Sequence, residues 1–190
     1  MKPRLLWGFL LLSLIAAPTL LVLRSRRTAL PVYGQVPAFT LTDQEGQPFA
    51  AAHLLNNVWI ADFIFTSCAG ACPEMTSRMV DLQKHLPSAI QLASVSVDPA
   101  RDTPDALRRY AQHYGADPAR WHFLTGPEPV LRPLIQNGFH LSLLEGSSPE
   151  EPIAHSQQFV LVDRKGQIRR YYNSTDPAEL KQLIRDARSL

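Results

Sequence analysis

The apolar residues of the chain follow two patterns, and each pattern predicts a different kind of element. Consecutive apolar, β-branched and aromatic residues bounded by polar turns are typical of buried strands, whereas apolar residues three or four positions apart indicate helices with one buried face. The first pattern predicts strands over residues 38–42, 58–65, 90–97, 121–124, 157–162 and 167–172. The second predicts helices over residues 73–86, 104–114, 129–137 and 177–187. Because strands and helices alternate, we expect an α/β sandwich with helices flanking one mixed central sheet.

Polar residues and prolines mark the ends of several of these elements. Asp102-Thr103-Pro104 and Asp176-Pro177 each supply a capping residue and a proline at the first helical position. Asp163-Arg164-Lys165-Gly166 predicts a hairpin turn between the last two strands. Residues 145–152 lack periodicity and predict an exposed acidic loop.

The N-terminal segment differs from the rest of the chain. Residues 5–23 contain no charge, and 19 helical residues would extend roughly 28 Å, close to a hydrocarbon core of about 30 Å. Small residues are not placed as a signal-peptide cleavage site requires, so we expect an uncleaved transmembrane anchor. The predicted organisation is an anchor with basic flanks over 1–27, a tether over 28–37 and one domain over 38–190. Basic residues lie on both sides of the apolar stretch, so charge does not decide the orientation of the anchor.

Composition narrows the class of protein. The chain of 190 residues has a net charge of +2, but residues 1–27 hold five basic residues and no acidic one, so the remainder is net negative. We therefore expect no binding to nucleic acid, which requires a concentrated basic surface. An apolar content of 45% excludes a disordered chain, and two cysteines are too few for a disulfide framework.

The two cysteines are the candidate chemical site. Cys68 and Cys72 lie between a predicted strand and a predicted helix, where the helix N-terminus favours a thiolate. A disulfide across so short a loop would add little stability, so the pair indicates redox chemistry or metal binding. The CxxxC spacing puts the sulfurs one helical turn apart, which suits a single metal ion better than the usual CxxC redox spacing does.

A histidine is the expected third partner of a soft metal. Two thiolates and an imidazole suit Cu(I), and with a further ligand they also suit Cu(II) or Zn(II). Three of the six histidines have polar neighbours, in or beside predicted helices, which predicts a surface role: His53, His85 and His113. Two flank aromatic positions, which predicts a packing role: His122 and His140. His155 begins the strand after the acidic loop, and its position alone is compatible with a ligand or with a capping or surface residue.

At these residues the chain resembles the Sco/SenC family of membrane-tethered, thioredoxin-fold copper proteins. The resemblance is carried by PAFTLTDQEGQPF, VWIADFIFTSCAGACPEM, SVSVDPARDTPDALRRYA and HSQQFVLVDRKGQIRRYY, which occur in that order. It implies a thioredoxin-like fold and copper ligands at Cys68, Cys72 and His155, with Asp98 near them. Asp98 also has a structural interpretation as the cap of the turn into Pro99. We interpret Met75 as a core residue rather than an axial ligand.

The resemblance also implies a function and a location. It predicts a copper metallochaperone that delivers copper to the binuclear centre of cytochrome c oxidase subunit II, held by a single-pass anchor in a bacterial inner membrane with its domain in the periplasm. The copper donor is not identified. The alternative is a membrane-tethered thiol–disulfide reductase that uses Cys68 and Cys72 as a redox pair to keep the acceptor cysteines reduced. A peroxidase or a redox or copper sensor has less support in the sequence.

Overall fold

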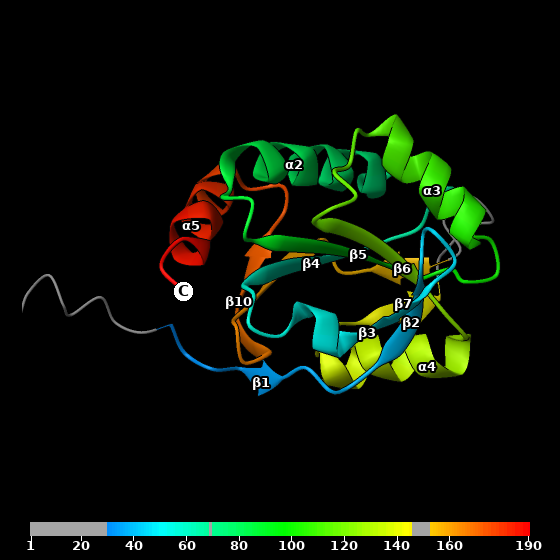
Figure 1. Ribbon diagram of the computed structural model, residues 1–190, viewed down its shortest axis with the longest axis horizontal. Helices are drawn as coiled ribbons and strands as arrows, with labels where there is room; N and C mark the ends of the chain where they lie inside the picture. The colour runs from blue at the N-terminus through cyan, green and yellow to red at the C-terminus, as the bar shows by residue number, and fades with distance from the viewer. Residues whose placement is uncertain (1–29, 69, 146–152) are drawn as a thin grey trace, which may run out of the picture. The chain divides into compact units, whose positions relative to one another are not determined.

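The computed structural model describes residues 30–68, 70–145 and 153–190, drawn in colour in Figure 1. The predicted anchor over 1–27 lies outside the described residues. Within the described ranges, no helix has both the length and the apolar character needed to cross a bilayer.

The described elements alternate between strands and helices along the chain. The strands are β1 (Gly34–Gln35), β2 (Thr40–Asp43), β3 (Pro48–Ala50), β4 (Trp59–Ile64), β5 (Gln91–Ser96), β6 (Trp121–Thr125), β7 (Leu143–Glu145), β8 (Ile153–His155), β9 (Gln158–Val162) and β10 (Gln167–Asn173). The helices are α2 (Ala71–His85), α3 (Pro104–His113), α4 (Glu128–Pro133) and α5 (Pro177–Ala187). A short 3₁₀ turn, η1 (Ala51–Leu54), follows β3, and a π-helical turn, η2 (Leu134–Gly138), follows α4.

Eight of the strands form one mixed sheet, which confirms the predicted architecture. Their order is β1-β10-β9-β4-β5-β6-β2-β3. The central strands β4, β5 and β6 are parallel, and the outer pairs are antiparallel. Every residue of β4 is buried, as expected for a central strand covered on both faces. The carboxyl ends of β4 and β5 therefore meet at one edge of the sheet, and the loops that follow them are neighbours.

The two faces of the sheet are covered by different helices. In Figure 1, α2, α3 and α5 lie over one face and α4 lies over the other. Trp59 and Phe63 of β4 make edge contacts with Phe139, directly after η2, at ring-centroid distances of 6.0 and 5.0 Å. Since side chains alternate along a strand, Asp62 points to the opposite face, beneath α2 and α3. A carboxyl group is thus placed in the core, on the face that α2 covers.

The segment predicted as a tether is partly built into the sheet. Within residues 28–37, β1 pairs with β10, and the amides of Tyr33 and Val36 donate to the carbonyls of Ile168 and Gly166, each at 2.9 Å. A β10 edge without this cover would expose a row of unpaired backbone groups. The compact unit consequently starts at Val32, several residues before the expected boundary at 38.

The other sequence predictions agree with the structure to within a few residues, apart from short elements. The sequence analysis missed β3 and the β7–β8 hairpin, because three residues are too few to show a period of two. Residues 129–137 were predicted as one helix, but they divide between α4 and η2. The predicted acidic loop is bounded by the hairpin strands, and its residues 146–152 lie outside the described residues.

Candidate metal centre

Cys68 and Cys72 lie in the connection from β4 to α2, as predicted. The amide of Cys68 donates to the carbonyl of Phe65 at 3.2 Å, which closes a turn directly after β4. Cys72 is the second residue of α2, whose N-cap, Gly70, provides no side-chain cap. No disulfide joins the two cysteines. Both sulfurs are therefore presented by backbone that the end of a central strand and the first turn of a helix hold in place.

The environment of Cys72 contradicts the expectation that the helix N-terminus favours its thiolate. Cys72 is 0% exposed, and burial raises the pKa of its thiol well above the usual range. The neighbouring Cys68 and the buried Asp62 raise this pKa further. Desolvation outweighs the helix dipole, whose effect amounts to at most about 2 kcal/mol even in favourable geometry. Without a metal, Cys72 is a protonated thiol at neutral pH, and binding a metal would release its proton.

Asp62 is a buried acid that the sequence analysis overlooked. Its side chain is completely buried, and Oδ1 accepts a hydrogen bond of 2.6 Å from the Ser94 hydroxyl. The Trp121 indole N–H in turn donates to the Ser94 oxygen at 2.9 Å. Oδ2 has no hydrogen-bond partner among the described residues, and burial raises the pKa of Asp62 to about 7. The sequence does carry a signal, because Asp62 is the single charge in the apolar run 58–65.

Asp102 is a second buried acid, in the segment Asp102-Thr103-Pro104 that was predicted to supply the cap of a helix. Of the residues proposed to begin the helix at 104, Thr103 is the N-cap, with its Oγ1 accepting from the Ala106 amide at 3.3 Å. Asp102 instead turns inward and binds Thr66 and Ser96, from the ends of β4 and β5. Burial raises its pKa. Asp102 thus joins the two loops at the carboxyl edge of the sheet.

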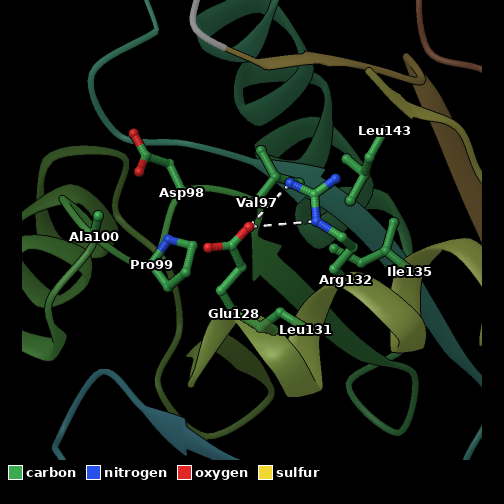
Figure 2. A pocket seen from close by; sticks show the side chains of 9 residues that line it. All are labelled: Val97, Asp98, Pro99, Ala100, Glu128, Leu131, Arg132, Ile135 and Leu143. Carbon is green, nitrogen blue, oxygen red and sulfur yellow. Dashed lines mark hydrogen bonds and ion pairs between the residues drawn. The ribbon is translucent and has the colours of Figure 1, made fainter. Parts of the chain in front are cut away.

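Asp98 follows β5 and is 7% exposed. Its carbonyl accepts from the amides of Arg101 and Asp102, so the backbone rather than the carboxylate stabilises the turn after Pro99. The carboxylate lies 3.4 Å from the Arg101 guanidinium in an ion pair. Figure 2 shows Asp98 at a small cavity of about 110 Å³, which is also lined by Glu128 and Arg132 of α4, an ion pair of 3.0 Å. The proposed place of Asp98 near the copper ligands stays a prediction.

His155 was predicted to begin the strand after the acidic loop, but it is the last residue of β8, a short strand separate from β9. In the β7–β8 hairpin, His155 is paired with Leu143, and Leu143 lines the cavity that Asp98 also lines (Figure 2). The backbone therefore brings the hairpin of His155 to the loop after β5. The side chain of His155 lies outside what the structure describes, so its role as a ligand stays a prediction. The described side chains contain no group of three His, Cys, Asp or Glu able to hold a metal.

The remaining candidate residues follow the sequence interpretation with one exception. His53, His85 and His113 are exposed, as predicted. The half-buried His122 ring packs against Phe49, with the ring centroids 4.6 Å apart. His140 was expected to pack, but it is exposed and adopts φ +54°, although its ring lies against Gly34. Met75 is 1% exposed, which agrees with its interpretation as a core residue.

Comparison with known proteins agrees with this architecture. A family profile described as SCO1/SenC matches residues 31–189. The crystal structure of a SCO1/SenC family lipoprotein from Bacillus anthracis is similar, with a TM-score of 0.77 and 30% identity over 87% of this chain and 98% of that one. The structure of BsSco is also similar, with a TM-score of 0.74 and 33% identity over 84% of this chain and 94% of that one. BsSco is described as having a disulfide switch and as a member of the Sco family of cytochrome c oxidase assembly proteins.

A copper-bound structure shows the same fold at greater sequence distance. ScoI from Bradyrhizobium japonicum with copper bound has a TM-score of 0.70 and 20% identity, over 82% of this chain and 99% of that one. The likeness to the Sco structures confirms the thioredoxin-like α/β fold that the resemblance implied. The profile match over most of the chain and the structural relatives at 30% identity or above lead to one conclusion: the chain belongs to the SCO1/SenC family.

Proposed function

We propose that this protein is a copper metallochaperone for the assembly of cytochrome c oxidase, with Cys68, Cys72 and His155 as its copper ligands. The observation that carries the proposal is the pair of thiols held between the end of β4 and the first turn of α2 in a member of this family. Thiolates are the ligands that Cu(I) prefers. The description of BsSco supports the assembly role, and the copper-bound ScoI supports the choice of metal.

The two cysteines would contribute differently to binding and release. Cys72 is buried and protonated at neutral pH, so copper binding must displace its proton. Cys68 is half-buried and closer to solvent. His155, carried on a separate hairpin, would complete the set and would be the ligand whose departure costs the least rearrangement of the core. Copper would then pass to an acceptor ligand by ligand, and the Cys72 thiolate would take up its proton last.

Copper binding by the purified chain tests this proposal. Copper stoichiometry and affinity are measured on the full chain with Cu(I) under reduction and against a competing chelator. We expect one copper per chain, loss of binding after oxidation of the cysteine pair, and at least a tenfold weaker affinity in His155→Ala. The matched control is His113→Ala, which removes an exposed imidazole from α3 and should bind as the wild type does. Equal affinities of the His155 variant and the wild type would refute the ligand set.

The partner and location follow from the same proposal. We infer delivery to the binuclear copper centre of subunit II, by a domain on the periplasmic side of a bacterial inner membrane, anchored through residues 5–23. The direct test is copper transfer from the loaded chain to the purified copper-binding domain of subunit II, followed by the absorption of the binuclear centre. Absence of transfer under reducing conditions would contradict this acceptor. Fractionation of cells expressing the chain, with protease added to spheroplasts, checks the location.

A thiol–disulfide reductase is the second candidate. It is favoured by the placement of two thiols in one connection and by the disulfide switch described for BsSco. A reductase needs both cysteines but not His155. Restoration of oxidase assembly by His155→Ala, together with its loss in Cys68→Ser, would favour the reductase over the chaperone.

A further inference from the structure

Asp102 joins the loop that carries Cys68 to the loop that carries Asp98. Its side chain is completely buried and accepts from the Thr66 hydroxyl at 2.6 Å and from the Thr66 amide at 3.1 Å. Its other oxygen accepts from the Ser96 hydroxyl at 2.6 Å. Thr66 follows β4 and Ser96 ends β5, so one carboxyl group binds the ends of two adjacent parallel strands.

The contact to Thr66 acts directly on the position of Cys68. The turn from Phe65 to Cys68 is closed by the Cys68 amide, and Thr66 is its second residue. Asp102 holds both the amide and the hydroxyl of Thr66, which leaves this turn little freedom. The backbone that leads into Cys68 is therefore held by the Cys68–Phe65 hydrogen bond and by the contacts of Thr66 with Asp102.

The contact to Ser96 extends the connection to the second loop. The Ser96 oxygen that donates to Asp102 accepts from the Asp98 amide at 3.1 Å, and the Asp102 amide donates to the Asp98 carbonyl at 3.0 Å. Because Asp102 immediately precedes the cap of α3, the start of that helix is held to the same cluster. The hydrogen bonds connect residues 66, 96, 98 and 102, which share no local sequence pattern.

We propose that Asp102 is a positioning residue for the metal centre, holding the Cys68 turn in the geometry that the metal requires by binding Thr66 and Ser96. This inference rests on the proposed copper function and names a residue outside its ligand set. Groups that orient metal ligands typically contribute 10–100-fold to metal affinity. Asparagine at position 102 keeps the size of the side chain, but its amide group presents hydrogens to one of the hydroxyl or amide donors. The cluster would then lose one acceptor, at Thr66 or at Ser96, without leaving a cavity.

Two pairs of variants separate positioning from general stability. Asp102→Asn removes one acceptor from the cluster, and Asp186→Asn is its control. Asp186 lies on α5, outside the Thr66–Asp102 cluster. It is also nearly buried, and it accepts a hydrogen bond of 2.7 Å from the Tyr172 hydroxyl. Thr66→Val removes the hydroxyl donor, whereas Thr66→Ser keeps it. Urea unfolding of the full chain establishes that each variant is folded, and how much stability it has lost.

The first readout is copper binding by the full chain. We expect Asp102→Asn and Thr66→Val to bind Cu(I) 10–100-fold more weakly and to shift the sulfur-to-copper absorption of the Cu(II) form. We expect Asp186→Asn and Thr66→Ser to bind as the wild type does, even where the Asp186 variant loses as much stability as the Asp102 variant. Wild-type affinity and spectrum in Asp102→Asn would overturn the proposal.

The second readout does not depend on copper. Cys72 is 0% exposed, so its alkylation by iodoacetamide in the metal-free chain requires the loop to open. We expect alkylation of Cys72 to be at least tenfold faster in Asp102→Asn and Thr66→Val, and unchanged in Thr66→Ser and Asp186→Asn. If the wild type binds no copper but these rates change as expected, the proposed function fails and the positioning role stands. If the wild type binds copper and the rates stay equal, only the positioning role fails.

Discussion

Replacing Asp62 by Asn should make the dependence of stability on pH visibly different from that of the wild type. Asp62 is completely buried, and desolvation raises its pKa from 3.8 to about 7. The folded chain therefore holds a proton between these two values that the unfolded chain has released. The free energy of unfolding falls with rising pH wherever the folded state binds more protons than the unfolded state. This group therefore makes the wild type progressively less stable from about pH 4 to pH 7. Asn at position 62 has a similar shape and does not titrate.

The size of the effect follows from the two pKa values. Each pKa unit corresponds to about 1.4 kcal/mol, so a group with values of 3.8 and about 7 changes the free energy of unfolding by roughly 2–3 kcal/mol between pH 5 and pH 8. At pH 5 the folded wild type carries a neutral carboxylic acid, whereas the unfolded chain is already largely ionised at this position. At pH 8 the folded wild type must bury a carboxylate that has one hydrogen bond, from Ser94 to Oδ1. The stability of the variant relative to the wild type should therefore rise by about that amount between pH 5 and pH 8.

Urea unfolding followed by tryptophan fluorescence provides the assay. The difference in unfolding free energy between Asp62→Asn and the wild type is measured from pH 5 to pH 8, which cancels groups that titrate in both chains. Ser94→Ala is the companion variant, because the Ser94 hydroxyl lowers the pKa of Asp62 and its removal should shift the transition to higher pH. A difference that is constant within about 0.5 kcal/mol over this range would refute the assignment of a raised pKa.

Three further substitutions test the packing and the backbone, each by urea unfolding at one pH. Phe139→Ala should cost about 3–5 kcal/mol, because its fully buried ring fills the space against β4 on the α4 side; a loss below 1 kcal/mol would show that the space collapses. Thr103→Ala should cost about 1 kcal/mol through loss of the cap on Ala106, with unchanged copper affinity. Gly166→Ala should cost about 1 kcal/mol or more, because φ is +76° and the new Cβ would lie 2.9 Å from Gln35; a neutral result would contradict strain at this turn.

The fold could be predicted from the sequence because its central elements are long and strongly patterned. The run 58–65 contains β4, and the spacing of Met75, Met79 and Leu82 marks the buried face of α2. The alternation of these elements is enough to predict a mixed α/β sandwich. The short strands β1, β3, β7 and β8 have no pattern of their own, since they form by pairing with an available partner strand.

The candidate site could be predicted only where its residues are close in sequence. Cys68 and Cys72 stand out through their spacing and their place between a strand and a helix. The buried roles of Asp62 and Asp102 were missed, because their partners lie 32 and 36 residues away at Ser94 and Thr66. The apolar run around Asp62 does signal that it is buried, but no local pattern reveals the distant partner of either acid.

The sequence by itself determined which type of chemistry to expect, since two thiols at this spacing, in the sequence blocks of this family, predict soft-metal or redox activity. Tertiary structure decided the state of those thiols. The helix dipole that favours a thiolate is local to α2 and could be anticipated, but the burial that keeps Cys72 protonated comes from the core around it. The free energy of a charge depends on the atoms and solvent around it in three dimensions, so the fold alone sets how much it costs to deprotonate Cys72 or Asp62.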